Sequence, residues 1–145
     1  MKGERIAYYG DVKYWLATSY VTQTRIRPPF DILTRWIDLS REGLLTIRLG
    51  YAWDGPSDPA PDLKCLMRPS LKHDAFGDLM RQGWLDFDSN FRAVNHDLEE
   101  TCLEDGCPEW AAHLVFHSVH DLSGGKWARY CSDGDGGSRP LCFAP

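Results

Sequence analysis

A histidine and an aspartate stand side by side in "SLKHDAFGDLMRQG", residues 70–83, a segment with helical spacing. A histidine can take a proton from water near neutral pH, and a carboxylate next to it can bind a cation. His73 and Asp74 are therefore the first candidates for chemistry in this chain. Whether they act depends on the segments that the fold packs against them.

Apolar residues recur every three to four positions after Pro69, and this spacing predicts a helix that ends at Gly83. On a helical wheel, His73 falls on one flank of the apolar face and Asp74 on the other. Gly77 lies one turn after His73 and leaves room beside the imidazole. The helix should therefore present the two side chains in different directions.

A second helix is predicted over about residues 90–105, with Ser89 as its N-cap. Asn95 falls inside its apolar stripe, where an amide without a partner would cost roughly 1–3 kcal/mol. The short connection between the helices favours antiparallel packing, which can place Asn95 opposite His73. Two interpretations stay open: a structural hydrogen bond, or an Asn95 that fixes the tautomer of a catalytic base. The predicted stripe consists of Phe91, Val94, Leu98 and Cys102.

Carboxylates gather around Asp74. Asp78 follows it by one turn, and the resulting repulsion can be relieved either by Arg81 or by a bound cation. Upstream, "WDGPSDPAPD" at residues 53–62 adds further carboxylates and backbone carbonyls that no regular structure would occupy. Hard oxygen ligands of this kind suit calcium, which takes six to eight of them. The predicted ligands are Asp74, Asp54, Gly55 and Asp62, with Asp58 in the same loop.

A third predicted helix, residues 109–122, offers a different kind of metal site. His113, His117 and Asp121 follow one another at i+4 spacing, and neutral imidazoles on one helical face can bind a transition metal. The alternative is that these histidines line a half-buried helix contact, because no cysteine or glutamate completes an HExxH-type signature. Both interpretations stay open at this point.

The first half of the chain is rich in β-branched and aromatic residues. Residues 13–24 and 34–39 are predicted strands, 40–44 a hairpin turn, and 44–53 the return strand. The expected fold class is α+β: an N-terminal antiparallel β-sheet or hairpin followed by three helices. We expect a single domain over residues 1–145, β-rich to about 52, a loop at 53–65, helical over 66–122 and irregular over 123–145.

Composition narrows the classes of partner. The 16 basic and 21 acidic residues give a net charge of −5, and no basic cluster is available to follow a phosphate backbone, so nucleic acid is an unfavourable partner. No apolar run is long enough for a signal peptide or a transmembrane segment, which predicts a protein that stays in a cytosol. The five cysteines are odd in number and lack a CxxC pair, which favours reduced, packing cysteines over a disulfide framework.

A family resemblance is carried by "GYAWDGPSDPAPDLKCLMRPSLKHDAFGDLMRQGWL" and the following "FRAVNHDLEETCLEDG". The chain resembles a family of tailed-phage and prophage proteins of unknown function over about residues 49–126. The family pattern is a WDGxS-type loop, an MRxSLxHDALYxLMRxG helix, and an AD helix that ends in DG. The resemblance implies a phage-encoded protein of the host cytoplasm or the virion, with phage or host proteins as partners.

The His-Asp helix of that family is in turn similar to the core of secreted phospholipase A2. The resemblance implies that His73 is the general base for water, Asp74 a calcium ligand, residues 53–57 a calcium loop, and Asn95 the residue that orients His73. The substrate would then be a lipid or another ester. In this pattern Asn95 would accept the Nδ1 proton of His73.

The chain departs from the family pattern at two of these positions. Asn95 replaces an aspartate and cannot stabilise the imidazolium that forms when His73 takes a proton, and Gly77 replaces an aromatic residue. Asp97, two residues beyond Asn95, could supply a carboxylate only by reaching around the helix. The expected function is calcium-dependent ester hydrolysis or a degenerate descendant of it. The alternative is a non-catalytic virion or tail component, or a modulator of a host factor, in which the same polar cluster is structural.

Overall fold

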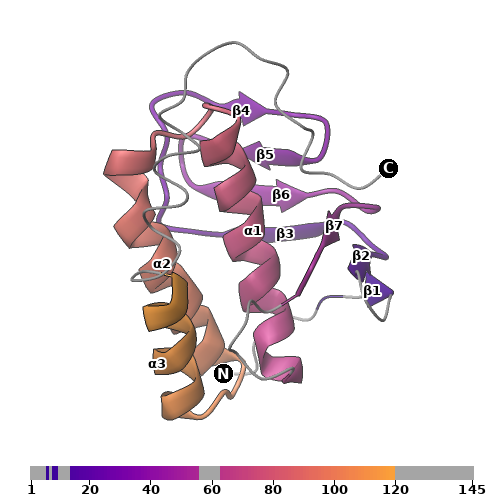
Figure 1. Cartoon of the computed structure of the whole chain (residues 1–145). Coiled ribbons are helices and arrows are strands. Elements are labelled where there is room, and N and C mark those ends of the chain that lie inside the picture. The colour runs from indigo at the N-terminus through magenta and orange to yellow at the C-terminus, as the bar shows by residue number, and fades with distance from the viewer. Residues whose placement is uncertain (1–5, 7, 10–13, 56–62, 120–145) are drawn as a thin grey trace.

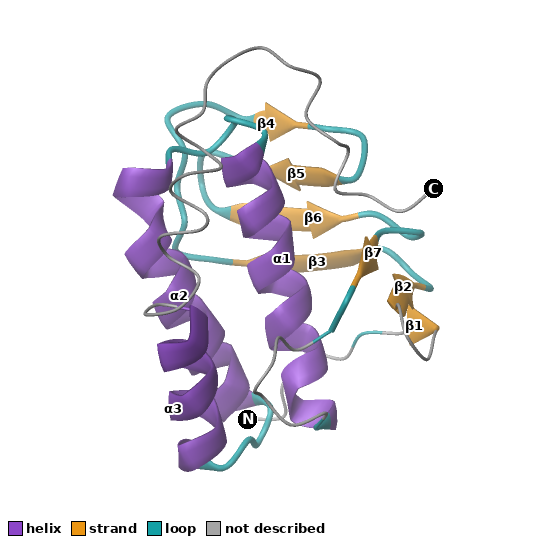
Figure 2. Ribbon diagram, in the orientation of Figure 1, coloured by secondary structure: helices purple, strands orange, loops and turns teal. Residues whose placement is uncertain are grey.

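The computed structural model of the chain describes residue 6 and residues 8–9, 14–55 and 63–119. Two small antiparallel sheets come first and three helices follow, which confirms the α+β fold class (Figures 1 and 2). The strands are β1 (Tyr8–Tyr9), β2 (Tyr14–Leu16), β3 (Tyr20–Gln23), β4 (Ile32–Leu33), β5 (Ile37–Leu39), β6 (Leu44–Ile47) and β7 (Ala52–Trp53). The helices are the 3₁₀ turn η1 (Lys64–Leu66), α1 (Met67–Arg81), α2 (Phe87–Glu104) and α3 (Glu109–His117).

The larger sheet has the strand order β3-β6-β5-β4, and its neighbours are antiparallel. Successive side chains alternate between its two faces, as a half-buried sheet requires. Residues 40–44 form the predicted hairpin turn between β5 and β6, closed by the hydrogen bond from Gly43 N to Ser40 O at 2.9 Å. The buried face carries fully enclosed aliphatic side chains, Ile37, Leu39, Leu45 and Ile47.

The predicted strands over 13–24 and 44–53 are each broken in two. β2 and β7 pair with each other in the smaller sheet, β1-β2-β7, whereas β3 and β6 pair in the larger one. The breaks lie side by side: Gly50 N donates to Leu16 O at 2.7 Å, and Leu16 N donates to Tyr51 O at 2.8 Å. The β2–β3 segment and the β6–β7 segment therefore bend at the same level, and both pass there between the larger sheet and the smaller one.

α1 lies across the buried face of the larger sheet, and α2 and α3 lie beside α1, to its left in Figure 1. Apolar side chains of the helix and the sheet share one core, to which α1 contributes Leu71, Ala75, Phe76 and Leu79. The helix is enclosed on nearly every side, so even Arg68 and Lys72 are only 3% and 4% exposed. The predicted pattern of one core face with two polar flanks is therefore too simple: the flanks are buried as well.

α2 begins earlier than predicted because its N-cap is Asp86 rather than Ser89. The carboxylate of Asp86 accepts a hydrogen bond from Ser89 N at 2.8 Å and another from Ser89 Oγ at 2.5 Å. A carboxylate can reach the free N–H of the third helical residue in this way. Val94, Asn95, Leu98 and Cys102 are buried as predicted, and Phe91 is half-buried.

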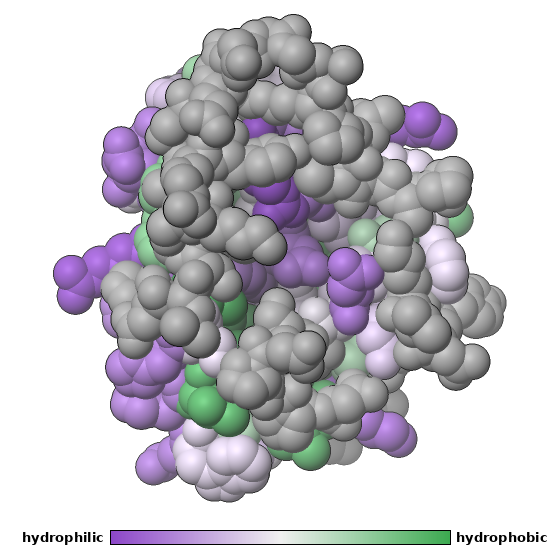
Figure 3. Space-filling view, viewed as in Figure 1, coloured by the Kyte–Doolittle hydropathy of each residue, from purple (hydrophilic) through white to green (hydrophobic). Residues whose placement is uncertain are grey.

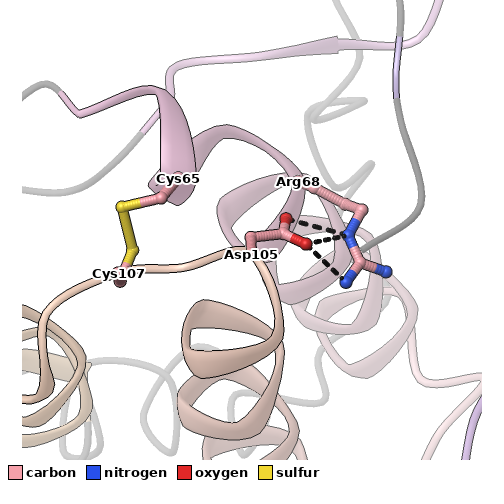
Figure 4. The surroundings of a disulfide bond; sticks show 4 residues. All are labelled: Cys65, Arg68, Asp105 and Cys107. Carbon is pink, nitrogen blue, oxygen red and sulfur yellow. Dashed lines mark hydrogen bonds and ion pairs between the residues drawn. A yellow bond between two sulfur atoms is a disulfide. The ribbon is translucent and has the colours of Figure 1, made fainter. Parts of the chain in front are cut away.

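A disulfide joins Cys65 to Cys107, which contradicts the prediction of reduced cysteines (Figure 4). The two Cα atoms lie 5.4 Å apart, within the range that a disulfide spans. The odd cysteine count does not exclude a single bond, and a sequence separation of 42 residues conceals the pairing. Cys102 is free and buried. Cys131 and Cys142 lie outside the described residues.

Candidate functional site

Polar side chains form three successive contacts along the buried interface between α1 and α2. Arg68 binds the carboxylate of Asp105 through two nitrogens, with Nη2 to Oδ1 at 2.8 Å and Nε to Oδ2 at 2.9 Å. One turn further along α1, Lys72 Nζ lies 3.1 Å from Asp97 and 3.0 Å from Thr101 Oγ1. The third contact joins His73 and Asn95. Because a buried polar group without its partner is costly, these contacts fix the register of the antiparallel helices.

The predicted hydrogen bond between His73 and Asn95 is present, but it uses the other ring nitrogen. Nε2 of His73 lies 2.9 Å from Oδ1 of Asn95, not Nδ1 as the sequence suggested. An amide oxygen only accepts, so Nε2 carries the hydrogen and Nδ1 holds the lone pair of the neutral imidazole. The two residues are 5% and 0% exposed. Asn95 thus selects the tautomer in which Nδ1 is the basic atom.

His73 is a neutral group at physiological pH. Burial lowers its pKa to about 4, and the positive charge of Arg81 acts in the same direction. The hydrogen bond from His73 to Asn95 opposes this shift but does not overcome it. A neutral imidazole is ready to accept a proton, yet a low pKa limits how strongly it can hold one.

Asp97 does not complete a catalytic pair with His73. Its carboxylate forms an ion pair with Lys72, and the two side chains are 16% and 5% exposed. Burial raises the pKa of Asp97 while Lys72 lowers it. The position of Asp97 is therefore explained by its ion pair, which neutralises the buried Lys72. Its predicted catalytic role is not supported by this contact.

Asp74 is surrounded by negative charge from Asp78 and Asp54. Burial is the main reason that its pKa rises to about 8. The carboxylates of Asp78 and Asp54 act in the same direction, and Arg81 opposes them. Arg81 forms its ion pair with Asp78, which also accepts a hydrogen bond from the buried hydroxyl of Tyr51. Arg81, which was predicted to relieve the repulsion between Asp74 and Asp78, therefore neutralises chiefly Asp78.

His73 and Asp74 meet at one cavity between the three helices and the end of β7. Leu66, Leu98, Val115 and Val119 form its apolar wall, and its polar lining consists of Gly55, Ser70, His73, Asp74 and Ser118. The space open to the centre of a water molecule is about 20 Å³, enough for one water. The cavity therefore brings His73, Asp74 and room for one water together.

Two contributors to this cavity escaped the sequence analysis. Ser70 accepts a hydrogen bond from Trp53 Nε1 at 3.1 Å and donates to Met67 O at 2.9 Å, so it joins β7 to α1. Ser118 follows α3 and donates to Leu114 O at 2.8 Å. Neither has a local signature, because the cavity arises only where three helices meet.

The calcium ligands predicted from the loop are only partly described. Gly55 borders the cavity beside Asp74, and Asp54 is close enough to raise the pKa of Asp74. Asp58 and Asp62 lie outside the described residues. Within the described ranges, no three histidine, cysteine or acidic side chains gather into a metal-binding group.

The alternative metal site on α3 is likewise described only in part. The rings of His113 and His117 are 4.9 Å apart, and Nδ1 of His113 lies 3.4 Å from Glu99 Oε2. The side chain of His113 is 71% exposed, so it does not line a half-buried contact either. Asp121 lies outside the described residues. Figure 3 shows hydrophobic atoms at the surface in the region of α3, where Trp110 and Leu114 are exposed.

Comparisons with models of protein families, with curated proteins and with solved structures found no match to this chain. Among the helices that the structure describes, none combines the length and the apolar character needed to span a bilayer.

Proposed function

We propose that this chain is a phage-encoded protein whose His73–Asp74 cavity is a phospholipase-A2-like hydrolytic site for a lipid or another ester. The observation that carries the proposal is the convergence of His73, Asp74 and Gly55 on a cavity with room for one water. The second support is Asn95, which holds Nε2 of His73 and leaves Nδ1 as the basic atom.

The reaction needs one proton transfer in each direction. Nδ1 of His73 takes a proton from water as the water oxygen attacks the ester carbonyl carbon. The tetrahedral intermediate then collapses, the carbon–oxygen bond to the leaving alcohol breaks, and the imidazolium returns its proton to that oxygen. The Nε2–H of His73 stays bonded to Asn95 throughout, so Asn95 acts as a positioning residue.

Calcium fits the charge pattern around Asp74. The two carboxylates of Asp74 and Asp54 lie close enough for one to raise the pKa of the other, and a divalent cation would relieve that repulsion. Asp74, Asp54 and the backbone carbonyl of Gly55 would hold the ion, with Asp62 as a further candidate. Bound there, calcium would polarise the ester carbonyl and stabilise the negative charge on its oxygen.

A second candidate function is favoured by the properties of His73 itself. A pKa of about 4 makes a weak base, and Asn95 adds no negative charge to stabilise the imidazolium. These features suit a non-catalytic phage component, such as a virion or tail protein or a modulator of a host factor, in which the His73–Asn95 pair fixes helix packing.

An ester-hydrolysis assay separates the two candidates. The full chain is tested on p-nitrophenyl esters and on phospholipid–detergent micelles, with and without millimolar calcium. His73→Gln should lower turnover by about 10²–10⁴-fold, the usual contribution of a general base. His96→Gln is the matched control, because His96 is an exposed histidine on α2 that does not line the cavity. Circular dichroism melts test whether both variants fold.

Two results would decide against hydrolysis: no turnover by the wild-type chain on any of these substrates, or full turnover by His73→Gln. Calcium binding is tested apart from activity by thermal melts. Calcium at 100 times its dissociation constant should add about 2.7 kcal/mol to the free energy of unfolding. If calcium does not shift the melting temperature of the wild-type chain, the calcium site is refuted. The role of His73 as a general base would then be tested by turnover alone.

A further inference from the structure

The Cys65–Cys107 disulfide connects the two segments that form one wall of the cavity. Cys65 lies in η1 next to Leu66, which lines the cavity. Cys107 lies at the corner between α2 and α3, and α3 leads to Val115 and Val119 on the same wall. The cross-link and these three side chains belong to one hydrophobic cluster. The bond therefore holds the apolar wall of the His73 cavity together.

α3 is attached to α2 by small buried side chains, by the His96–Phe116 ring contact and by the His113–Glu99 pair, in which the His113 side chain is 71% exposed. It has only nine residues, no side chain caps its N-terminus, and its buried side chains within the helix, Ala111, Ala112 and Val115, are small. By contrast, the α1–α2 junction beside the disulfide is held by Arg68 and Asp105, as Figure 4 shows. Loss of the disulfide should thus loosen η1 and α3 far more than the α1–α2 pair.

We infer that the Cys65–Cys107 bond is a redox-controlled cross-link that orders the η1 and α3 wall of the cavity when oxidised and releases it when reduced. In the reduction, a small-molecule thiolate attacks one sulfur and forms a mixed disulfide. A second small-molecule thiolate then attacks the small-molecule sulfur of the mixed disulfide and displaces the remaining cysteine as a thiolate, which yields two cysteine thiols and one small-molecule disulfide; oxidation is the reverse exchange. The effect on wall order is independent of catalysis, and only its consequence for turnover rests on the proposed function.

The three described cysteines are arranged for this reversible exchange. Cys65 is half-buried, whereas Cys107 is 6% exposed, so we expect an external thiol to attack at Cys65 first. Cys102 is fully buried in the same cluster, and burial raises the pKa of its thiol to about 12. A thiol that does not ionise is a poor nucleophile, so Cys102 does not compete for either partner.

Hydrogen exchange read by mass spectrometry tests the inference on the full chain. The oxidised protein should yield a linked Cys65–Cys107 peptide, and equilibration with reduced glutathione should break it. On reduction, exchange should accelerate by on the order of tenfold or more in α3 and η1 and stay nearly unchanged in the core of α1. Opening a loop of 42 residues should also raise the equilibrium constant for global unfolding by on the order of several hundredfold.

Three variants complete the design. Cys65→Ser and Cys107→Ser should show fast exchange in α3 with or without reductant, while Cys102→Ser should keep the wild-type response. The inference is overturned if the linked peptide is absent, if the bond survives reduced glutathione, or if α3 exchanges equally in both states. Failure of the hydrolytic proposal is a different result: hydrogen exchange in α3 would still depend on oxidation, but the chain would show no ester turnover.

Discussion

Replacement of Asn95 by aspartate tests the electrostatic account of the His73 site most directly. In the wild-type protein, a neutral amide oxygen lies 2.9 Å from Nε2 of a buried histidine whose pKa is about 4. Asn95→Asp keeps the shape and the acceptor but adds a negative charge. The carboxylate should therefore stabilise the imidazolium that the amide cannot.

The size of the effect follows from the separation of the charges. Two unit charges about 4 Å apart attract by about 4 kcal/mol at an effective dielectric constant near 20. At 1.36 kcal/mol per pKa unit, this would raise the pKa of His73 by about 3. Desolvation of the new carboxylate opposes part of the gain. The pKa of His73 in Asn95→Asp should therefore rise from about 4 to near 6 or above.

The same shift predicts a change in stability with pH. In the wild-type chain the folded pKa of His73, about 4, lies below its ordinary value of 6.5, so the unfolded state binds a proton first as the pH falls. The contribution of the neutral His73 to the free energy of unfolding is fully present above pH 6.5. It is lost as the pH falls toward 4, by roughly 3 kcal/mol in all. Asn95→Asp should remove most of that loss.

The assay is an NMR titration of the Cε1–H resonance of His73 in both chains, combined with urea unfolding at pH 4.5 and pH 7. A His73 pKa that stays below 5 in Asn95→Asp, in a folded protein, would refute the electrostatic reasoning. If the site is hydrolytic, the variant should also gain turnover, because a stronger base of the same geometry holds the transferred proton better.

Three further predictions concern the surroundings of the site. Asp74→Asn should abolish calcium stabilisation in thermal melts and should stabilise the calcium-free chain increasingly between pH 4 and 8, because a folded pKa of about 8 makes ionisation of the wild-type carboxyl unfavourable. Arg68→Ala should cost up to about 3–5 kcal/mol in urea unfolding because it leaves the Asp105 carboxylate, 12% exposed, without its guanidinium partner, whereas Arg25→Ala, an 86% exposed control, should cost under about 1 kcal/mol. Gly43→Ala should destabilise more than Gly106→Ala in the same measurement: both have a positive φ, but only at Gly43 would the new Cβ lie 2.5 Å from a backbone oxygen.

The local patterns of the sequence located much of this fold. The 3.6-residue period predicted α1 and α2, the turn at residues 40–44 predicted the β5–β6 hairpin, and Asn95 inside an apolar stripe predicted a buried amide that must find a partner. These predictions succeed because helix periodicity, turn geometry and the cost of an unpaired buried group depend on residues close together in the chain.

The tertiary structure decided everything that depends on distant partners. It divided two predicted strands between two sheets and paired Cys65 with Cys107. It also placed Asp97 in an ion pair with Lys72 and made Nε2 of His73 the donor to Asn95. Each outcome depends on which surfaces meet in space, and a side chain's neighbours across helices leave no mark in its local sequence. The sequence thus predicted that Asn95 would be buried and could bond to His73, and the packing of three helices determined that His73 is buried as well, which of its ring nitrogens bonds to Asn95 and which cavity it lines.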